Sequence, residues 1–147
     1  MGAREATPAQ AQAAEAIGCA LAGAGAVVVC GGHGGVMAAV CRGAAGAGGL
    51  TVGILPGRDR SAANEWVAVA IPSGLGELRN GLIVWTADVV IAVGGAYGTL
   101  SEVALALAAG VPVVGLDTWS IEGIEAVASP SEAVTRALEL ARGRGAG

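Results

Sequence analysis

The chain has 147 residues, of which 54% are apolar, and a formal net charge of −4. This length supports one sizeable core, so we expect a single domain over residues 1–147. The acidic charge argues against a nucleic-acid partner, which normally requires a basic face.

The region 16–40 carries no charge except at His33, which raises the question of a membrane span. Repeated glycines interrupt it, and its two apolar parts resemble a helix and a short strand rather than one span of about 20 residues. No basic segment precedes an apolar one at the N-terminus, so we expect no secretory signal. These features predict a cytoplasmic protein that does not associate with a membrane.

The three cysteines, Cys19, Cys30 and Cys41, are odd in number and their spacing matches no zinc pattern. We therefore expect reduced thiols and no metal site.

Short β-branched runs alternate along the chain with helical stretches rich in alanine and leucine. The expected helices are Pro8–Ala22, Gly35–Ala45, Gly76–Ala87, Thr99–Ala109 and Pro130–Arg142. The expected strands are Ala26–Cys30, Thr51–Leu55, Trp66–Ile71, Asp88–Val93, Val111–Leu116 and Ile124–Ala128. Nearly all these strands are continuous apolar runs, which indicates burial on both faces. The pattern predicts an α/β fold with a doubly wound, mainly parallel, Rossmann-like sheet.

Two glycine-rich turns follow expected strands: CGGHGGVM after the first and VGGAYGT after the fourth. Each precedes a helix start, so together they can form a phosphate cradle. Neither is a Walker loop, and no acid lies about 20 residues past GGHGG, as a dinucleotide site would need. Packing alone remains an equal alternative for each turn.

Glu102 has two interpretations. Thr99-Leu100-Ser101-Glu102 fits a capping box, in which the two side chains would only close the start of a helix. The same pattern recurs at 7–10 and 129–132, where nothing suggests a site. Arg79 alone could be a solvated surface charge, but it starts a helix whose end lies at the same sheet edge as Glu102 and both glycine turns. This convergence favours a ligand site.

With these motifs, the sequence resembles the Lonely Guy (LOG) family of phosphoribohydrolases, often mislabelled lysine decarboxylases, and more closely its molybdenum cofactor carrier relatives. The resemblance covers roughly residues 9–116 and rests on GGHGGVMAAV, TVGILPG, ELRNGLIVWTADVVIAVGGAYGTLSE and GVPVVGL. It implies catalytic roles for Arg79 and Glu102. The implied phosphate and nucleotide contacts are Gly34, Gly35 and Met37 in the first turn and Gly94, Gly95, Gly98 and Thr99 in the second; Gly31 and Gly32 of the first turn are further candidates.

The chain departs from the LOG pattern in three places. Val93 replaces a proline and Asn80 replaces a lysine, and both changes lean toward the carrier branch. The family's first strand and its Gly-Ser turn are missing from the chain as it stands. Either the start codon is misplaced or the domain works without that strand, which would leave the pocket without one of the family's walls.

The first functional hypothesis is hydrolysis of the N-glycosidic bond of a nucleoside 5′-monophosphate, with Glu102 near the ribose and Arg79 orienting it. The alternative is a non-catalytic carrier or sensor of molybdenum cofactor or a nucleotide. A remnant that binds nothing is a third option. No cofactor is expected, and lysine decarboxylation is rejected because the chain has no lysine to hold pyridoxal phosphate. Asp88 is interpreted as a turn or cap residue, and His33 as a loop residue that could also touch the ligand. Tyr97 lies inside the phosphate loop and could stack on a base or merely cover it.

The helix containing VALALAAG shows no polar face beyond Glu102, and the one from Arg79 is also apolar from Gly81 to Trp85. Helices that are apolar all round need a second cover. We therefore predict a homodimer with these two helices at its centre, which Leu105→Glu would split with loss of nucleotide binding.

Overall fold

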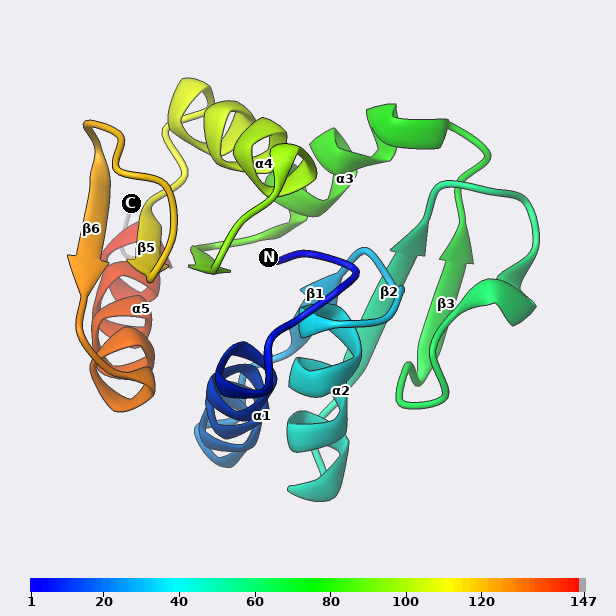
Figure 1. Cartoon of the computed structure of the whole chain (residues 1–147), viewed down its shortest axis with the longest axis horizontal. Helices are drawn as coiled ribbons and strands as arrows, with labels where there is room; N and C mark the ends of the chain where they lie inside the picture. The colour runs from blue at the N-terminus through cyan, green and yellow to red at the C-terminus, as the bar shows by residue number, and fades with distance from the viewer. Residues whose placement is uncertain (146–147) are drawn as a thin grey trace.

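The computed structural model describes residues 1–145 as six strands, five α-helices and two 3-10 turns (Figure 1). The strands are β1 (Val28–Cys30), β2 (Thr51–Leu55), β3 (Val69–Pro72), β4 (Val90–Val93), β5 (Val113–Leu116) and β6 (Ile124–Val127). The helices are α1 (Pro8–Gly23), α2 (Val36–Gly46), α3 (Arg79–Thr86), α4 (Tyr97–Ala108) and α5 (Pro130–Gly145), with 3-10 turns η1 (Arg60–Ala62) and η2 (Gly76–Leu78).

The strands form two parallel three-stranded sheets, in the orders β1-β2-β3 and β4-β5-β6. Met1 lies against the β4 edge, where its amino group donates to Ile91 O (2.5 Å) and its carbonyl accepts from Val93 N (2.9 Å). A cavity of about 450 Å³ separates β1 from β4 beside this contact. The predicted α/β, Rossmann-like fold with parallel strands is thus confirmed.

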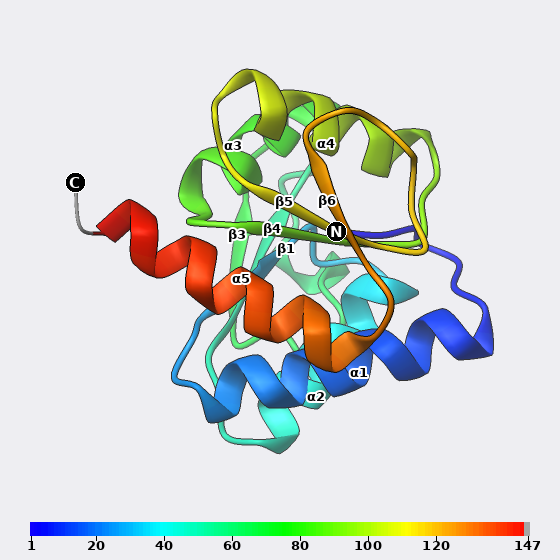
Figure 2. The same ribbon diagram turned by 90° about the vertical axis from the view of Figure 1, so that its left-hand side faces the viewer.

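Helices cover both faces of the strands. Figures 1 and 2 show α3 and α4 on one side and α1, α2 and α5 on the other. The larger buried cluster joins α1, α2 and α5 to β4 and β5, and a second cluster lies under α3 and α4. Alanine and valine dominate both clusters, as a chain without phenylalanine requires.

Strand β3 differs from the expectation that both strand faces are buried. It is an edge strand, and Val69 and Ile71 are 44% and 43% exposed. The apolar run is therefore not a sign of burial here. Strand β3 begins at Val69, three residues after the predicted start at Trp66. The residues before Val69 form a turn that is hydrogen-bonded to Asn64.

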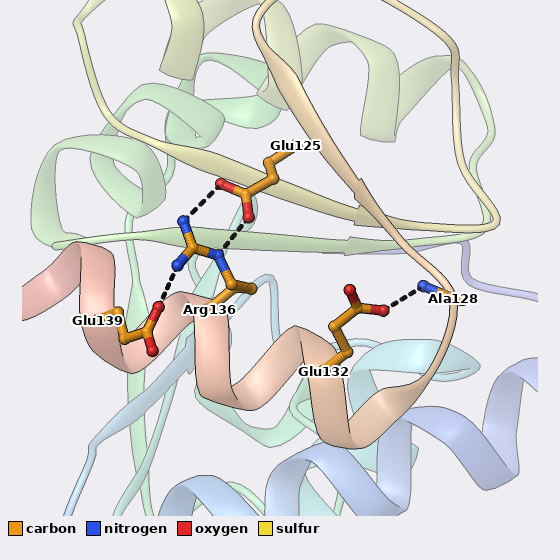
Figure 3. Close-up of polar contacts among 5 residues, drawn as sticks. All are labelled: Glu125, Ala128, Glu132, Arg136 and Glu139. Atoms are coloured by element: carbon orange, nitrogen blue, oxygen red, sulfur yellow. Dashed lines mark hydrogen bonds and ion pairs between the residues drawn. The ribbon is translucent and has the colours of Figure 1, made fainter.

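Two of the three capping patterns close helices. Thr7 and Gln10 form a complete capping box on α1. At α5, Ser129 accepts from the Glu132 amide (3.1 Å), while the Glu132 side chain accepts from Ala128 N (2.8 Å; Figure 3). Figure 3 also shows Arg136 of α5 paired with Glu125 of β6 and with Glu139, which fastens the last helix to the edge strand.

The third pattern, at Thr99, is not a cap. Helix α4 begins at Tyr97 and its N-cap is Ala96, so Thr99 and Glu102 both lie inside the helix. Gly98 takes the helical conformation, although glycine usually marks a turn. The capping interpretation of Glu102 is therefore wrong. Within residues 1–145, no helix is long and apolar enough to span a membrane.

Candidate functional site

A cavity of about 520 Å³ lies where α2, α3 and α4 begin. These helices follow β1, β3 and β4, so the cavity lies at the carboxyl ends of the strands, where ligands bind in sheets of this kind. Its walls include Met37 from α2, Arg79 and Asn80 from α3, and Thr99 and Glu102 from α4. The structure thus brings together the two residues predicted to be catalytic and three of the expected binding residues, Met37, Gly98 and Thr99.

Arg79 is a buried cation at this cavity. It is 4% exposed, and its Nη1 donates to the carbonyl of Ile54 at 2.7 Å. Its Nε is buried and makes no hydrogen bond within the described residues. Burial lowers the pKa of Arg79, and the charge of Glu102 opposes that change. An unpartnered donor on a buried guanidinium costs free energy unless a ligand accepts from it.

Gly31 fixes the position of this guanidinium. A Cβ at residue 31 would lie 2.2 Å from Arg79 Nη1 and 2.9 Å from Met37 Sδ. We expect Gly31→Ala to displace the guanidinium from Ile54 and to weaken binding of a phosphorylated ligand at least tenfold. Isothermal titration would measure this change. Gly46→Ala is the matched control, because residue 46 is exposed, lies outside the cavity lining and has nothing within 4 Å of a Cβ; equal affinities of the two variants would contradict the role of Gly31.

The first turn of α4 offers donors to an anion. The first amide bonded within the helix is that of Leu100, which donates to Ala96 O (3.0 Å), so the amides of residues 97–99 have no partner inside it. Thr99 is 2% exposed, and its hydroxyl has no hydrogen-bond partner among the described residues. Amides and hydroxyl together can bind a phosphate at the positive end of the helix dipole.

Glu102 places a carboxyl group one turn further along α4. It is 9% exposed, and burial raises its pKa, partly offset by the charges of the N-terminal amino group and Arg79. No ion pair within 4.0 Å joins it to a described cation. Such a buried, unpaired carboxyl facing a cavity is typical of a functional group, although structural networks also shift pKa values.

Among the other predicted glycines, only Gly98 lines the cavity, and the lining does not include Gly32, Gly34, Gly35, Gly94 and Gly95. A Cβ at Gly32, Gly94 or Gly95 would clash with Leu55, Gln10 or Trp119. Close packing therefore accounts for these three. A Cβ at Gly35 would lie 2.4 Å from Ala3 O, which accepts from Val36 N at 3.1 Å. The first amide of α2 is thus bonded to the chain itself.

The N-terminal segment Gly2–Glu5 also lines the cavity, and no motif in the sequence predicts this. Its contacts with Gly35 and Val36 are made through the backbone atoms of Ala3 and Arg4, so they leave no pattern of side chains. Glu77 and Asn80 also line the cavity and were not predicted as contacts. For Asn80, the available signal was its place directly after Arg79.

His33, Tyr97 and Asp88 lie outside the lining of this cavity. His33 Nε2 lies 3.2 Å from Arg4 Nη2, and burial lowers its pKa. Tyr97 is 83% exposed and its ring lies 6.1 Å from that of Trp119. Asp88 is exposed and lines the other cavity.

Comparison with known proteins identifies relatives with this architecture. The chain resembles the molybdenum cofactor binding protein from the phototrophic bacterium Rippkaea orientalis, with 38% identity, TM-score 0.88, and coverage of 95% of this chain and 92% of that one. The molybdenum cofactor carrier protein from Chlamydomonas reinhardtii is 32% identical, with TM-score 0.89 and coverage of 97% and 95%.

At the sequence level, an uncharacterized protein of Archaeoglobus fulgidus is 43% identical over 119 residues, which are 80% of this chain and 78% of that protein. The family model that matches is the SLOG cluster4 family, over residues 1–142. This agrees with the predicted resemblance to the superfamily that holds the LOG enzymes and the carrier proteins. The chain belongs to the SLOG cluster4 family.

Proposed function

We propose that this protein binds and carries a phosphorylated small molecule of the molybdenum cofactor type. The observation that carries the proposal is the set of unpartnered buried donors, Arg79 Nε and the Thr99 hydroxyl, on residues that line one cavity. The likeness to the Rippkaea and Chlamydomonas proteins supports molybdenum cofactor as the cargo.

In this proposal, the amides of residues 97–99 and the Thr99 hydroxyl bind the phosphate. Arg79 adds a charge-assisted hydrogen bond, which is roughly twice as strong as a neutral one. The cavity has room for more than the phosphate, since its volume is about 520 Å³. Glu102 in its ionised form accepts from N–H groups of a pterin or base.

A second candidate function is hydrolysis of a nucleoside 5′-monophosphate. The specific observation in its favour is that Glu102, a buried carboxyl, shares the cavity with Arg79. A carboxylate beside the ribose would stabilise the oxocarbenium character that develops as the N-glycosidic bond breaks. Arg79 would orient that carboxylate or stabilise the departing base.

One paired experiment separates the two functions. The protein is titrated calorimetrically with molybdenum cofactor and with AMP and GMP, and the nucleotide samples are then analysed for free base by chromatography. The carrier proposal expects binding of molybdenum cofactor and no released base. Release of base that Glu102→Gln abolishes would favour the hydrolase, and the absence of any binding heat would contradict both.

Glu102→Gln also tests the buried carboxyl through stability. Because burial raises the pKa of Glu102 above 4.5, the folded protein holds this proton more tightly than the unfolded chain. The stability that protonated Glu102 contributes is fully present below pH 4.5. It is lost as the pH rises through the pKa of Glu102 in the folded protein. The neutral glutamine avoids that loss. We expect the variant's Tm to exceed the wild-type Tm at pH 8, with the difference shrinking toward pH 4.

Differential scanning calorimetry across pH 4–8 measures this difference. Glu65→Gln is the matched control, since it makes the same substitution at an exposed residue outside the cavity lining. A pH-independent difference for Glu102→Gln would contradict the raised pKa.

We also propose a homodimer through α3 and α4, but Leu105→Glu is a poor test of it. Leu105 is half-buried and packs on the cluster under α4, so a charge there would unfold the chain. The helices are not apolar and buried all round, since α4 exposes Ser101 and Ala104. The apolar surface left open includes Leu78 and Trp85, which are 80% and 68% exposed.

Trp85→Glu is expected to convert the dimer to monomers without loss of helix content, because burying a charge at an apolar interface is costly. Light scattering at micromolar concentration measures the molar mass. Leu50→Glu, which makes the same kind of change at a 47% exposed residue before β2, should leave the dimer intact. A wild-type protein that is monomeric at this concentration would refute the interface.

A further inference from the structure

Two of the three cysteines meet beneath the first glycine-rich turn. Cys30 ends β1 and Cys41 lies in α2, and their Sγ atoms are 3.5 Å apart. The residues are 5% and 0% exposed, whereas Cys19 on α1 is exposed. The fold therefore holds one pair of thiols in contact and keeps the third outside it.

The two thiols have unequal chemistry. The Cys30 sulfur accepts from the Gly32 amide at 3.3 Å and lies against Cys41. The hydrogen bond from Cys41, followed by that amide and the charges of the N-terminus and Arg79, lowers the pKa of Cys30 to about 7 against the opposing effect of burial. The hydrogen bond with Cys30 and burial raise the pKa of Cys41. Cys30 is thus the nucleophile of the pair and Cys41 is the thiol that can attack second.

A small oxidant can reach Cys30. This residue lines the cavity of about 450 Å³ between β1 and β4, which shares Gly2, Met37 and Glu102 with the candidate ligand cavity. Cys41 does not need access of its own, since its sulfur already touches that of Cys30.

We propose that Cys30 and Cys41 form a redox-sensitive pair that hydrogen peroxide converts into a disulfide. The Cys30 thiolate attacks one peroxide oxygen, the O–O bond breaks, and the departing hydroxide takes a proton to become water. The Cys41 sulfur then attacks the resulting sulfenic acid, its thiol proton and the sulfenic hydroxyl leaving as a second water. Both thiols are oxidised by one electron each, and the peroxide is reduced to two waters.

Oxidation would also reach the ligand site. The sulfur atoms would approach from 3.5 Å to about 2.05 Å, and Cys30 would give up its bond from Gly32. Cys30 directly precedes Gly31, against which Arg79 packs. We therefore expect the oxidised protein to bind its phosphorylated ligand at least tenfold more weakly, a consequence that rests on the proposed function.

The test treats the full chain with stoichiometric hydrogen peroxide in a Cys19→Ala background, which removes the exposed thiol. Intact mass spectrometry should show a loss of about 2 Da that dithiothreitol reverses, and peptide mapping should join residues 30 and 41. Cys41→Ser, whose hydroxyl can still donate to the Cys30 sulfur, should instead accumulate a sulfenic acid on Cys30 that dimedone labels. Circular dichroism checks that this second variant is folded.

An unchanged mass after peroxide treatment, or oxidation of Cys30 and Cys41 to separate sulfinic acids, would overturn the proposal. The mass, peptide-mapping and dimedone measurements need no ligand, so their results test the disulfide independently of the proposed carrier function. Titration of molybdenum cofactor into the reduced and oxidised forms then measures the change in affinity. If the reduced and oxidised forms bind molybdenum cofactor equally well, oxidation does not affect the ligand cavity, and the proposal that the disulfide forms is unchanged.

Discussion

Gly43→Ala is expected to lower the free energy of unfolding by about 3 kcal/mol, at the upper end of what overpacking normally costs. Helices α1 and α2 pack with their backbones in contact. A Cβ at Gly43 would lie 2.0 Å from Glu15 O and 2.8 Å from Glu15 C. Gly18 of α1 makes the reciprocal contact, with a Cβ position 2.0 Å from Val40 O. Neither obstacle is a flexible side chain, so the helices must separate.

Urea denaturation followed by circular dichroism measures the loss. Gly46→Ala is the matched control in the same helix, because nothing lies within 4 Å of a Cβ at residue 46. Alanine favours helix more than glycine does, so this control should be neutral or slightly stabilising. If the two variants were equally stable, close backbone contact between α1 and α2 would not be a source of stability.

This helix contact illustrates what the sequence could and could not predict. The boundaries of β2 and the start of α1 were predicted without error, because β-branched residues and the capping box at Thr7 mark them. The composition predicted a thinly packed core with close backbone contacts. It could not say which glycines make those contacts, since Gly18 and Gly46 look alike in a helical stretch.

The candidate site shows the same division. Motif resemblance and strand order placed Arg79 and Glu102 at one edge, and both line the cavity. The capping interpretation failed at Glu102 because α4 begins two residues before Thr99, with no side chain closing its end. A sequence pattern can predict a helix start that a side chain caps. It does not predict a helix start whose first amides have no side-chain acceptor.

Features that depend on long-range backbone contacts were beyond the sequence. The N-terminal segment reaches the cavity by bonding to β4 and α2 through backbone atoms. The contact between Cys30 and Cys41 depends on how α2 packs against β1, and their spacing of 11 positions follows no metal-binding pattern.

Arg79→Met is expected to weaken binding of the phosphorylated ligand by at least about tenfold, which corresponds to one charge-assisted hydrogen bond of roughly 1.5 kcal/mol or more. Methionine keeps an unbranched apolar stem in a site that is 4% exposed, and it removes the guanidinium. Circular dichroism and thermal unfolding check that the variant is folded, because the substitution leaves the Ile54 carbonyl without its donor from Arg79. Calorimetric titration of molybdenum cofactor measures the affinity.

Arg60→Met is the matched control, since Arg60 is an exposed residue of η1 outside the cavity lining. It tests whether a lost positive charge alone, through long-range attraction of an anion, explains the weaker binding. That long-range effect fades as salt screens it, with a Debye length of about 8 Å at 0.15 M ionic strength. The loss caused by Arg79→Met should therefore persist at 0.5 M salt, because the guanidinium acts by direct contact inside a buried site. An affinity that matches the control at both salt concentrations would mean that Arg79 serves the fold, through Ile54 and Gly31, and does not touch the ligand.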